Sequence, residues 1–102
     1  MFNFFKKAEN KLSLNLACFT TKNVVSKKFP ITRVYHFSDG NWQFSDDESS
    51  NSNENIMIVS LGQVLKIDKT IENLLSMSAS HCAKHDKKTN TWTMSKFEEE
   101  GE

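Results

Sequence analysis

The chain has 102 residues, and its 13 Lys and Arg side chains balance 13 Asp and Glu, so the formal net charge is zero. This length allows one compact domain, and a neutral chain has no overall electrostatic field to attract nucleic acid or a membrane surface, so we expect neither as a partner. Leu, Ile, Val and Phe total 25 residues, which is enough to build one modest core.

The first residues have the pattern of a short amphipathic helix. Over residues 2–12, apolar side chains such as Phe2, Phe5 and Ala8 recur at three- and four-residue steps. We expect residues 1–14 to form a helical extension that docks on the domain or frays, rather than one that anchors on a membrane surface, because so short an apolar stripe buries little area. No apolar run approaches the about 18 residues that cross a bilayer, and no secretion signal is apparent, so we expect a cytoplasmic protein.

Three segments alternate apolar and polar residues or have a β-favouring composition, which predicts strands over residues 14–21, 31–37 and 41–45. Between the first two we expect a turn or a single helical turn, which ends before Pro30 because proline restricts the preceding residue to extended conformations. The last two are joined by Asp39-Gly40, the dipeptide of a type I′ hairpin turn, in which both central residues need a positive φ.

Residues 45–55 contain no apolar side chain, so nothing in them offsets the entropy cost of ordering, and we expect a mobile, exposed loop. Charge is unevenly spread around this segment: residues 1–37 have a net charge of +6, whereas residues 38–55 have −5 and no Lys or Arg. Charge runs of this kind are usually solvated loops, but this one adjoins the most aromatic hairpin of the chain. It is therefore the segment to test as a docking surface.

The second half of the chain predicts a strand, two helices and a hairpin. The continuous apolar run from Ile56 to Val59 is typical of a strand, over residues 56–60, that is covered on both faces. Ser60 with Gln63 forms a capping box that opens a helix, and Asp68 can cap a second one. The predicted segments are helices at residues 60–67 and 69–76, followed by a hairpin of residues 78–86 and 91–97.

These elements predict a single α+β domain over residues 15–97, with a small, mainly antiparallel sheet and two short helices on one face. A mixed sheet is the alternative, because the order of the strands does not follow from their sequence patterns. Residues 98–102 form an acidic tail. We expect a monomer or a weak homodimer.

Few residues suggest catalysis or metal binding. His81, Cys82 and His85 are close in sequence, but a structural zinc site needs four ligands, and a strand would place the cysteine opposite the two histidines. Cys82 with His36 could form a thiolate–imidazole pair, yet no third group accompanies them. We therefore predict no metal, no cofactor and no catalytic residue, and we expect Cys18 and Cys82 to be reduced and buried.

Several short motifs occur in an order that resembles one known family. They are Ala17-Cys18-Phe19-Thr20-Thr21-Lys22, Pro30-Ile31, Val34-Tyr35-His36, Asp39-Gly40, Trp42-Gln43-Phe44, Val59-Ser60-Leu61-Gly62 and Ile67-Asp68. Over about residues 17–75 the chain is similar to a small bacterial domain family grouped with the immunity proteins of polymorphic toxin systems, immunity protein family 33. This resemblance implies a small cytosolic α+β domain that neutralises a toxin by binding it, without enzymatic activity.

If a toxin is the partner, the acidic segment suits a basic protein such as a nuclease, because carboxylates speed the encounter and can occupy phosphate positions. The predicted contact residues are Trp42, Asp46, Asp47, Glu48 and Glu54, with the tryptophan as an anchor candidate. The main alternative is a small-molecule-binding or regulatory module whose ligand lies between a hairpin and the helices. An enzyme that uses Cys82 or His36 is a third interpretation.

Overall fold

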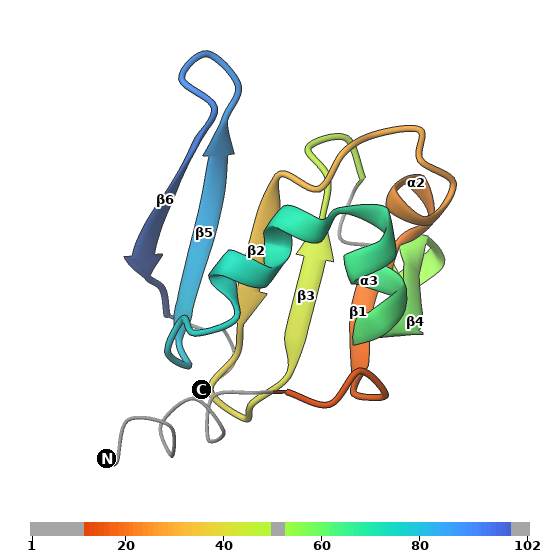
Figure 1. Ribbon diagram of the computed structural model, residues 1–102, viewed down its shortest axis with the longest axis horizontal. Coiled ribbons are helices and arrows are strands. Elements are labelled where there is room, and N and C mark those ends of the chain that lie inside the picture. Colours follow the sequence, from red (N-terminus) through yellow and green to blue (C-terminus); the bar gives the residue numbers. More distant parts are fainter. Residues whose placement is uncertain (1–11, 50–52, 99–102) are drawn as a thin grey trace.

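Six strands form one sheet in the computed structural model, which describes residues 12–49 and 53–98 of the chain (Figure 1). The strands are β1 (Ala17–Thr21), β2 (Arg33–His36), β3 (Trp42–Ser45), β4 (Ile56–Ser60), β5 (His81–Asp86) and β6 (Thr91–Lys96). Their order in the sheet is β4-β1-β3-β2-β5-β6. Neighbouring strands are antiparallel except β1 and β3, which are parallel. The predicted α+β class is confirmed, and the sheet is of the mixed type.

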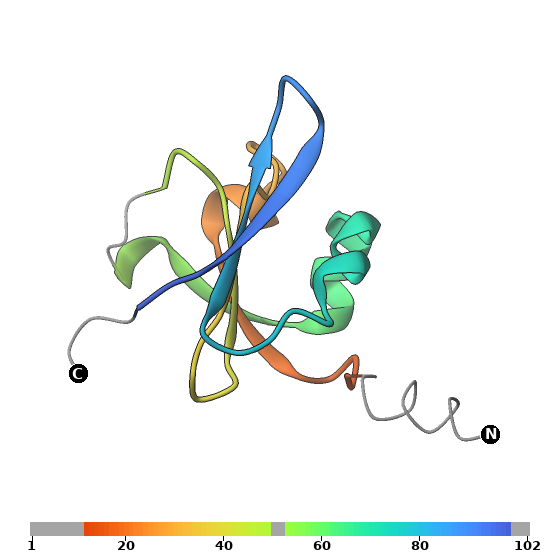
Figure 2. The same ribbon diagram turned by 90° about the vertical axis from the view of Figure 1, so that its left-hand side faces the viewer.

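Short helices accompany the sheet. They are α2 (Lys22–Val25), α3 (Leu61–Ile67) and two 3-10 helices, η1 (Asn53–Asn55) and η2 (Lys69–Leu74). α3 and η2 lie together on one face of the sheet, as predicted (Figure 2). Each begins at its predicted cap: the Ser60 side chain accepts a hydrogen bond from the N–H of Gln63, and the Asp68 side chain accepts one from the N–H of Thr70. The second helix is a 3-10 helix and ends two residues earlier than predicted.

The parallel pairing of β1 with β3 follows from the path of the chain. After β1 the chain makes the predicted single helical turn, α2, and crosses to β2, and β3 then returns between β2 and β1. Thr21 ends β1 and caps α2, because its side chain accepts a hydrogen bond from the N–H of Val24. Since β1 and β3 run in the same direction, both strands finish at the same end of the sheet.

The turn between β2 and β3 differs from the predicted type I′ turn. Gly40 has a positive φ of 95°, and Asp39 does not. The N–H of Gly40 donates to the carbonyl oxygen of Phe37 (2.9 Å), and the N–H of Phe37 donates to that of Asn41 (2.8 Å). This is a three-residue loop closed by a glycine bulge, so one residue with positive φ is enough.

The core lies between the sheet and the layer formed by α3 and η2. Side chains alternate between the two faces of a strand, so every second residue of β3, β2 and β5 points toward the helices. Phe44, Val34 and Ala83 from these strands pack with Val64 and Ile71 from the helices, and all five are fully buried. These contacts close one face of the sheet.

β4 does not have the two-sided cover that its apolar sequence predicts. It is an edge strand: it pairs with β1, and no strand in the described part of the chain pairs with its other side. Val59 is buried on the helix side, whereas the neighbouring Ile58 is 68% exposed. The prediction was wrong because an apolar run does not reveal how many layers cover a strand.

Both predicted terminal segments fall mainly outside the described residues. Residues 1–11 of the predicted N-terminal helix lie outside the described residues. Residues 12–16 contain a turn but no helix. The predicted acidic tail lies outside the described residues after Glu98. Among residues 12–49 and 53–98, no helix has the length and apolar character needed to cross a membrane.

The contrast in burial predicts different costs for the same substitution at two isoleucines. Ile71→Val removes one methyl group from a fully buried side chain and should lower the free energy of unfolding by about 1 kcal/mol. Ile58→Val, at an exposed position, should change it by less than about 0.5 kcal/mol. Urea denaturation followed by circular dichroism measures both, and equal losses would contradict the assigned core.

Candidate partner-binding surface

The segment that joins β3 to β4, residues 46–55, contains four of the five predicted contact residues, and we call it the acidic connection. It begins at the end of the sheet where β1 and β3 finish, and its described parts project on the side away from α3 and η2 (Figure 2). Asp47, Glu48 and Glu54 are exposed. These three carboxylates therefore face solvent outside the helix-covered face.

Asp46, in contrast, is only 3% exposed. Its Oδ2 accepts hydrogen bonds from the hydroxyls of Thr21 (2.6 Å) and Ser49 (2.7 Å), and its Oδ1 accepts from the N–H groups of Glu48 (2.8 Å) and Ser49 (2.6 Å). The prediction of a mobile, exposed loop is therefore wrong for its first residues. Buried polar bonds can order a segment that has no apolar side chain, because they satisfy a charge that would otherwise be costly to bury.

These hydrogen bonds also set the acidity of Asp46. Burial of the carboxylate opposes ionisation, but the bonds from Thr21, from Ser49 and from two backbone N–H groups outweigh burial and lower the pKa of Asp46 below its usual value. The group is therefore ionised at neutral pH. We correct its predicted role: Asp46 anchors the acidic connection to the end of β1 and is not a surface contact.

Trp42, the predicted anchor for a partner, is a core residue. Its side chain is 2% exposed and stacks on His36, with ring centroids 3.9 Å apart, and on Phe44, at 6.1 Å. Strand alternation places it with Phe44 on the face that the helices cover. A partner cannot reach this ring while the sheet is folded, so the anchor assignment is corrected to a core role.

Asp47 is partly engaged within the chain. Its Oδ1 accepts a hydrogen bond from the hydroxyl of Thr32 (2.8 Å) and lies 3.3 Å from Nε of Arg33. The side chains of Arg33 and Asp47 are 44% and 45% exposed, so this ion pair contributes little to stability and can exchange for an external partner. Glu48 and Glu54 add two further exposed negative charges.

The sheet face opposite the helices, which we call the open face, exposes apolar side chains near the acidic connection. Strand register places Ile58, Phe19, Gln43 and Tyr35 in one row across β4, β1, β3 and β2. The last three are partly exposed and Ile58 is the most exposed. Sequence reasoning missed this row, because alternation along a strand shows which side chains share a face but not whether helices cover that face.

Aromatic side chains cover another part of the open face. The ring of Phe97 lies 5.5 Å from that of Tyr35 and 5.9 Å from that of Phe37, measured between centroids. Phe97 follows β6, so the chain folds back over β2 at this point. The part of the open face that remains for a partner is therefore the side formed by β1 and β4, with Phe19 and Ile58.

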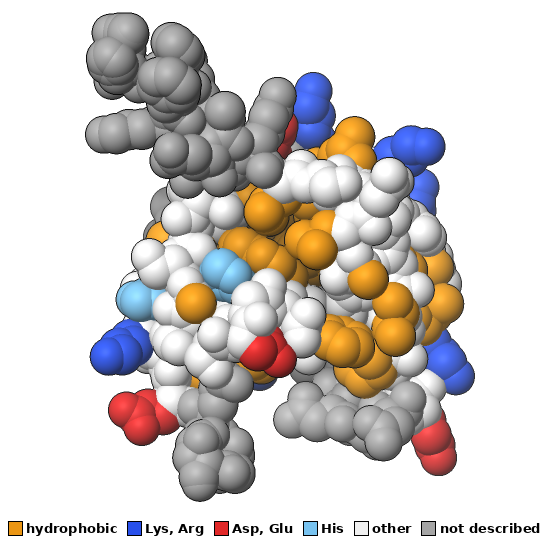
Figure 3. Space-filling model, turned by 90° about the horizontal axis from the view of Figure 1, so that it is seen from below, with side chains coloured by type: hydrophobic (Ala, Val, Ile, Leu, Met, Phe, Trp, Pro, Cys, Tyr) orange, Lys and Arg blue, Asp and Glu red, His pale blue; other side chains and the backbone are white. Residues whose placement is uncertain are grey.

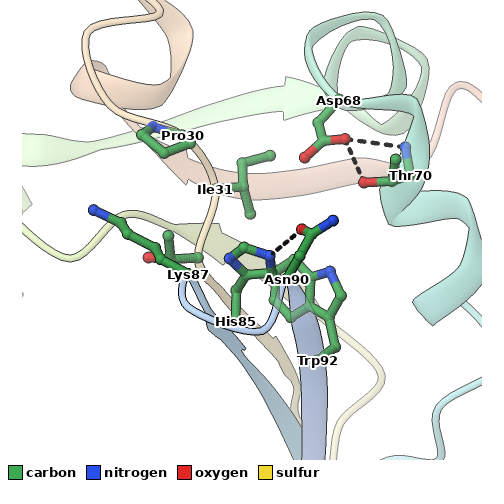
Figure 4. Close-up of a pocket in the computed structure, with 9 residues that line it drawn as sticks. Pro30, Ile31, Asp68, Thr70, His85, Lys87, Asn90 and Trp92 are labelled. Carbon is green, nitrogen blue, oxygen red and sulfur yellow. Dashed lines mark hydrogen bonds between the residues drawn. The ribbon is translucent and has the colours of Figure 1, made fainter.

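A hollow of about 480 Å³ lies between the β5–β6 hairpin and the start of η2 (Figure 4). Trp92 and His85 line it from the hairpin, Asp68 lines it from the junction of α3 and η2, and Ile31 lies between them. The Nε2 atom of His85 is 3.0 Å from the side-chain oxygen of Asn90. A ligand in this hollow would lie between a hairpin and a helix, the general arrangement that the small-molecule interpretation expects.

A second hollow, of about 290 Å³, lies at the end of the sheet opposite the acidic connection, where hydrophobic side chains gather in Figure 3. It is lined by Leu12, Leu16, His36, Gly40, Trp42, Leu75, Ser76 and Met77. The Nδ1 atom of His36 is 2.8 Å from the carbonyl oxygen of Met77. We assign no ligand to this hollow, because the described chain begins at its rim.

Cys82 and His36, the pair considered for catalysis, lie on neighbouring strands but on opposite faces of the sheet, because Cys82 pairs with Tyr35 and His36 pairs with His81. Both cysteines are free and buried, as expected. Burial raises the pKa of the Cys18 thiol to about 11, so it is protonated at neutral pH and is a poor nucleophile. In residues 12–49 and 53–98, no three His, Cys, Asp or Glu side chains form a cluster suited to a metal ion.

The sequence of this domain identifies its family. Residues 18–96 match the family model of the immunity protein Imm33 domain. The chain belongs to this family. The matched region includes the sheet and the layer of α3 and η2, and the resemblance drawn from the sequence motifs is confirmed. No curated protein and no solved structure matches the chain.

Asp46→Asn should destabilise this Imm33 domain. The amide is similar in size but places N–H donors where four donors converge, so we expect the free energy of unfolding at pH 7 to fall by about 2 kcal/mol. Asp47→Asn is the matched control, and the loss of its half-exposed ion pair should cost less than about 1 kcal/mol. Equal effects in urea denaturation would contradict the anchoring role of Asp46.

The pH dependence tests whether the charge of Asp46 is responsible. Because its folded-state pKa is lowered, its stabilisation is complete above the unfolded-state value, about 4, and is lost as pH falls through the folded-state value. The stability difference between the unaltered chain and Asp46→Asn should therefore shrink below about pH 4. A difference that stays constant down to about pH 2 would exclude the charge as the cause.

Proposed function

We propose that this Imm33 domain is a non-enzymatic immunity protein that binds a toxin protein in the bacterial cytoplasm and blocks its activity. Family membership supports the immunity class. The observation that supports direct binding is that Asp47, Glu48 and Glu54 are exposed beside a partly apolar sheet face that α3 and η2 do not cover. The proposed contact residues are Asp47, Glu48, Glu54 and Ile58.

The charge of this surface favours a basic partner. Residues 34–65 contain no Lys or Arg, so the basic residues nearest in sequence to the acidic connection are Arg33, which pairs with Asp47, and Lys66. Complementary charge raises the rate of encounter more than it raises the final affinity. A toxin that acts on nucleic acid has a basic active-site face, where the carboxylates of Glu48 and Glu54 would take the place of phosphates.

Apolar contact supplies the affinity that charge alone does not. Exposed charges are screened at physiological salt, with a Debye length of about 8 Å, so a purely electrostatic complex would be weak. The side chain of Ile58 is largely exposed, and its burial against a partner contributes about 1 to 2 kcal/mol. In this proposal the carboxylates guide the toxin to the surface and the open face holds it.

Binding of a small molecule is the second candidate function. The hollow of about 480 Å³ combines the ring of Trp92 with the carboxylate of Asp68, and ligand sites often pair an apolar wall with a few polar groups. A small molecule that copurifies with the chain and is lost in Trp92→Ala would favour this candidate. Family membership favours the toxin partner.

The first test is capture of the partner. A tagged chain is used to isolate bound proteins from a lysate of the source organism at low and at high salt, and mass spectrometry identifies them. The identified protein is then purified, and its toxic activity is assayed with and without the chain. We expect a stoichiometric complex that abolishes the activity, whereas a purified toxin that stays active in the presence of excess chain would contradict the proposal.

A charge-matched pair of variants tests the surface. Glu48→Gln with Glu54→Gln should slow association with the toxin about three- to tenfold at low salt and weaken its salt dependence. Glu72→Gln with Glu98→Gln removes the same charge from exposed positions outside the acidic connection and should leave both quantities unchanged. Stopped-flow association kinetics measure both variants, and equal slowing would show that only net charge matters.

A further inference from the structure

The edge of the sheet at β4 presents backbone groups as well as side chains. In an antiparallel pair, residues alternate between those that exchange backbone hydrogen bonds with the neighbouring strand and those whose N–H and C=O point the other way. The N–H of Leu61 donates to the carbonyl oxygen of Leu16 (2.8 Å), which sets the phase of this alternation. By the register of the ladder, Val59 bonds to β1 and Ile58 turns its N–H and C=O away from β1.

Ile58 is thus exposed in two ways. Its side chain is exposed on the open face, and its backbone is directed to the free edge of β4. Ile56, two residues earlier, has the same backbone orientation. The N–H and C=O of Ile58 and the C=O of Ile56 are therefore placed to bond a further β-strand.

β4 lacks the features that usually protect an edge strand. Charged residues, prolines and bulges discourage pairing with another chain at an edge. Residues 56–60 contain no charge and no proline, and their ladder with β1 runs through five successive pairs without a bulge. At the opposite edge, β6 ends in Lys96, a residue type that discourages pairing at an edge. The two edges therefore differ, and β4 is the one suited to pairing.

We propose that the toxin adds an extended segment to β4 and so lengthens the sheet by one strand. This inference rests on the proposed function, since it states how the same surface holds its partner. The added strand bonds to the backbone of Ile58 and Ile56 and places an apolar side chain against Ile58. A basic side chain of the same segment lies near Glu54, which stands two residues before β4.

Charge selects a segment of another protein over a second copy of this chain. The acidic connection leads directly into β4, and its residues 46–55 carry four carboxylates and no Lys or Arg. A second copy that paired through β4 would bring no compensating base with this strand, because residues 34–65 contain no Lys or Arg. A basic segment gains from this charge instead, as the toxin of the proposed function does.

Two substitutions at one position separate the backbone from the side chain. Ile58→Pro removes the N–H that faces the added strand but no bond to β1, a placement that edge strands tolerate. Ile58→Ala shortens the side chain and keeps the N–H. We expect toxin affinity to fall about tenfold in Ile58→Ala and about a hundredfold or more in Ile58→Pro. Equal losses, with both variants folded by circular dichroism, would overturn strand addition.

Amide exchange on the unaltered chain gives a second test that needs no variant. By nuclear magnetic resonance, the amide of Ile58 should exchange rapidly in the free chain, while that of Val59 is protected by its bond to β1. On binding the purified toxin, the Ile58 amide should become protected by about a hundredfold or more.

The outcomes distinguish this inference from the proposed function. If the toxin binds and the Ile58 amide still exchanges rapidly, the immunity function stands and strand addition is wrong. If no toxin binds, both proposals fall. If the Ile58 amide is protected in the free chain and sedimentation shows a dimer, a second copy occupies the edge, and the inference is overturned.

Discussion

The carboxylate of Asp46 holds the end of β1, the start of α2 and the acidic connection together. This is a consequence of the parallel pairing of β1 with β3, which brings Thr21 and the residue after β3 to the same end of the sheet. Thr21 donates to Asp46 and also caps α2, so one hydroxyl links three elements. With the connection fixed at this point, its remaining carboxylates face outward, and the chain enters β4 beside β1 as an edge strand.

Local signals in the sequence predict local structure well. The caps at Ser60 and Asp68 and the C-terminal hairpin depend on residues close together in the chain, and all occur where the sequence indicates. Features that depend on distant residues were not predictable in this way. The burial of Trp42 and Asp46 and the exposure of Ile58 depend on strand order and on which face the helices cover, and neither is encoded in a short segment.

The two faces of the sheet thereby serve different purposes. The face toward α3 and η2 carries the fully buried core and gives the domain its stability. The open face keeps Phe19 and Ile58 accessible at the side where an acidic segment joins an unprotected edge strand. In the proposed function, this combination provides charge for encounter, apolar area for affinity and backbone groups for a directed contact. None of these needs a catalytic group.

The central claim is that this side of the molecule, and not a hollow on the helix side, receives the partner. A crystal structure of the chain bound to its purified toxin tests this most directly. The account predicts toxin atoms in contact with Glu48, Glu54 and Ile58, and a toxin strand hydrogen-bonded to the outer edge of β4. A toxin seated between the β5–β6 hairpin and η2, with the acidic connection and β4 free in solvent, would contradict it.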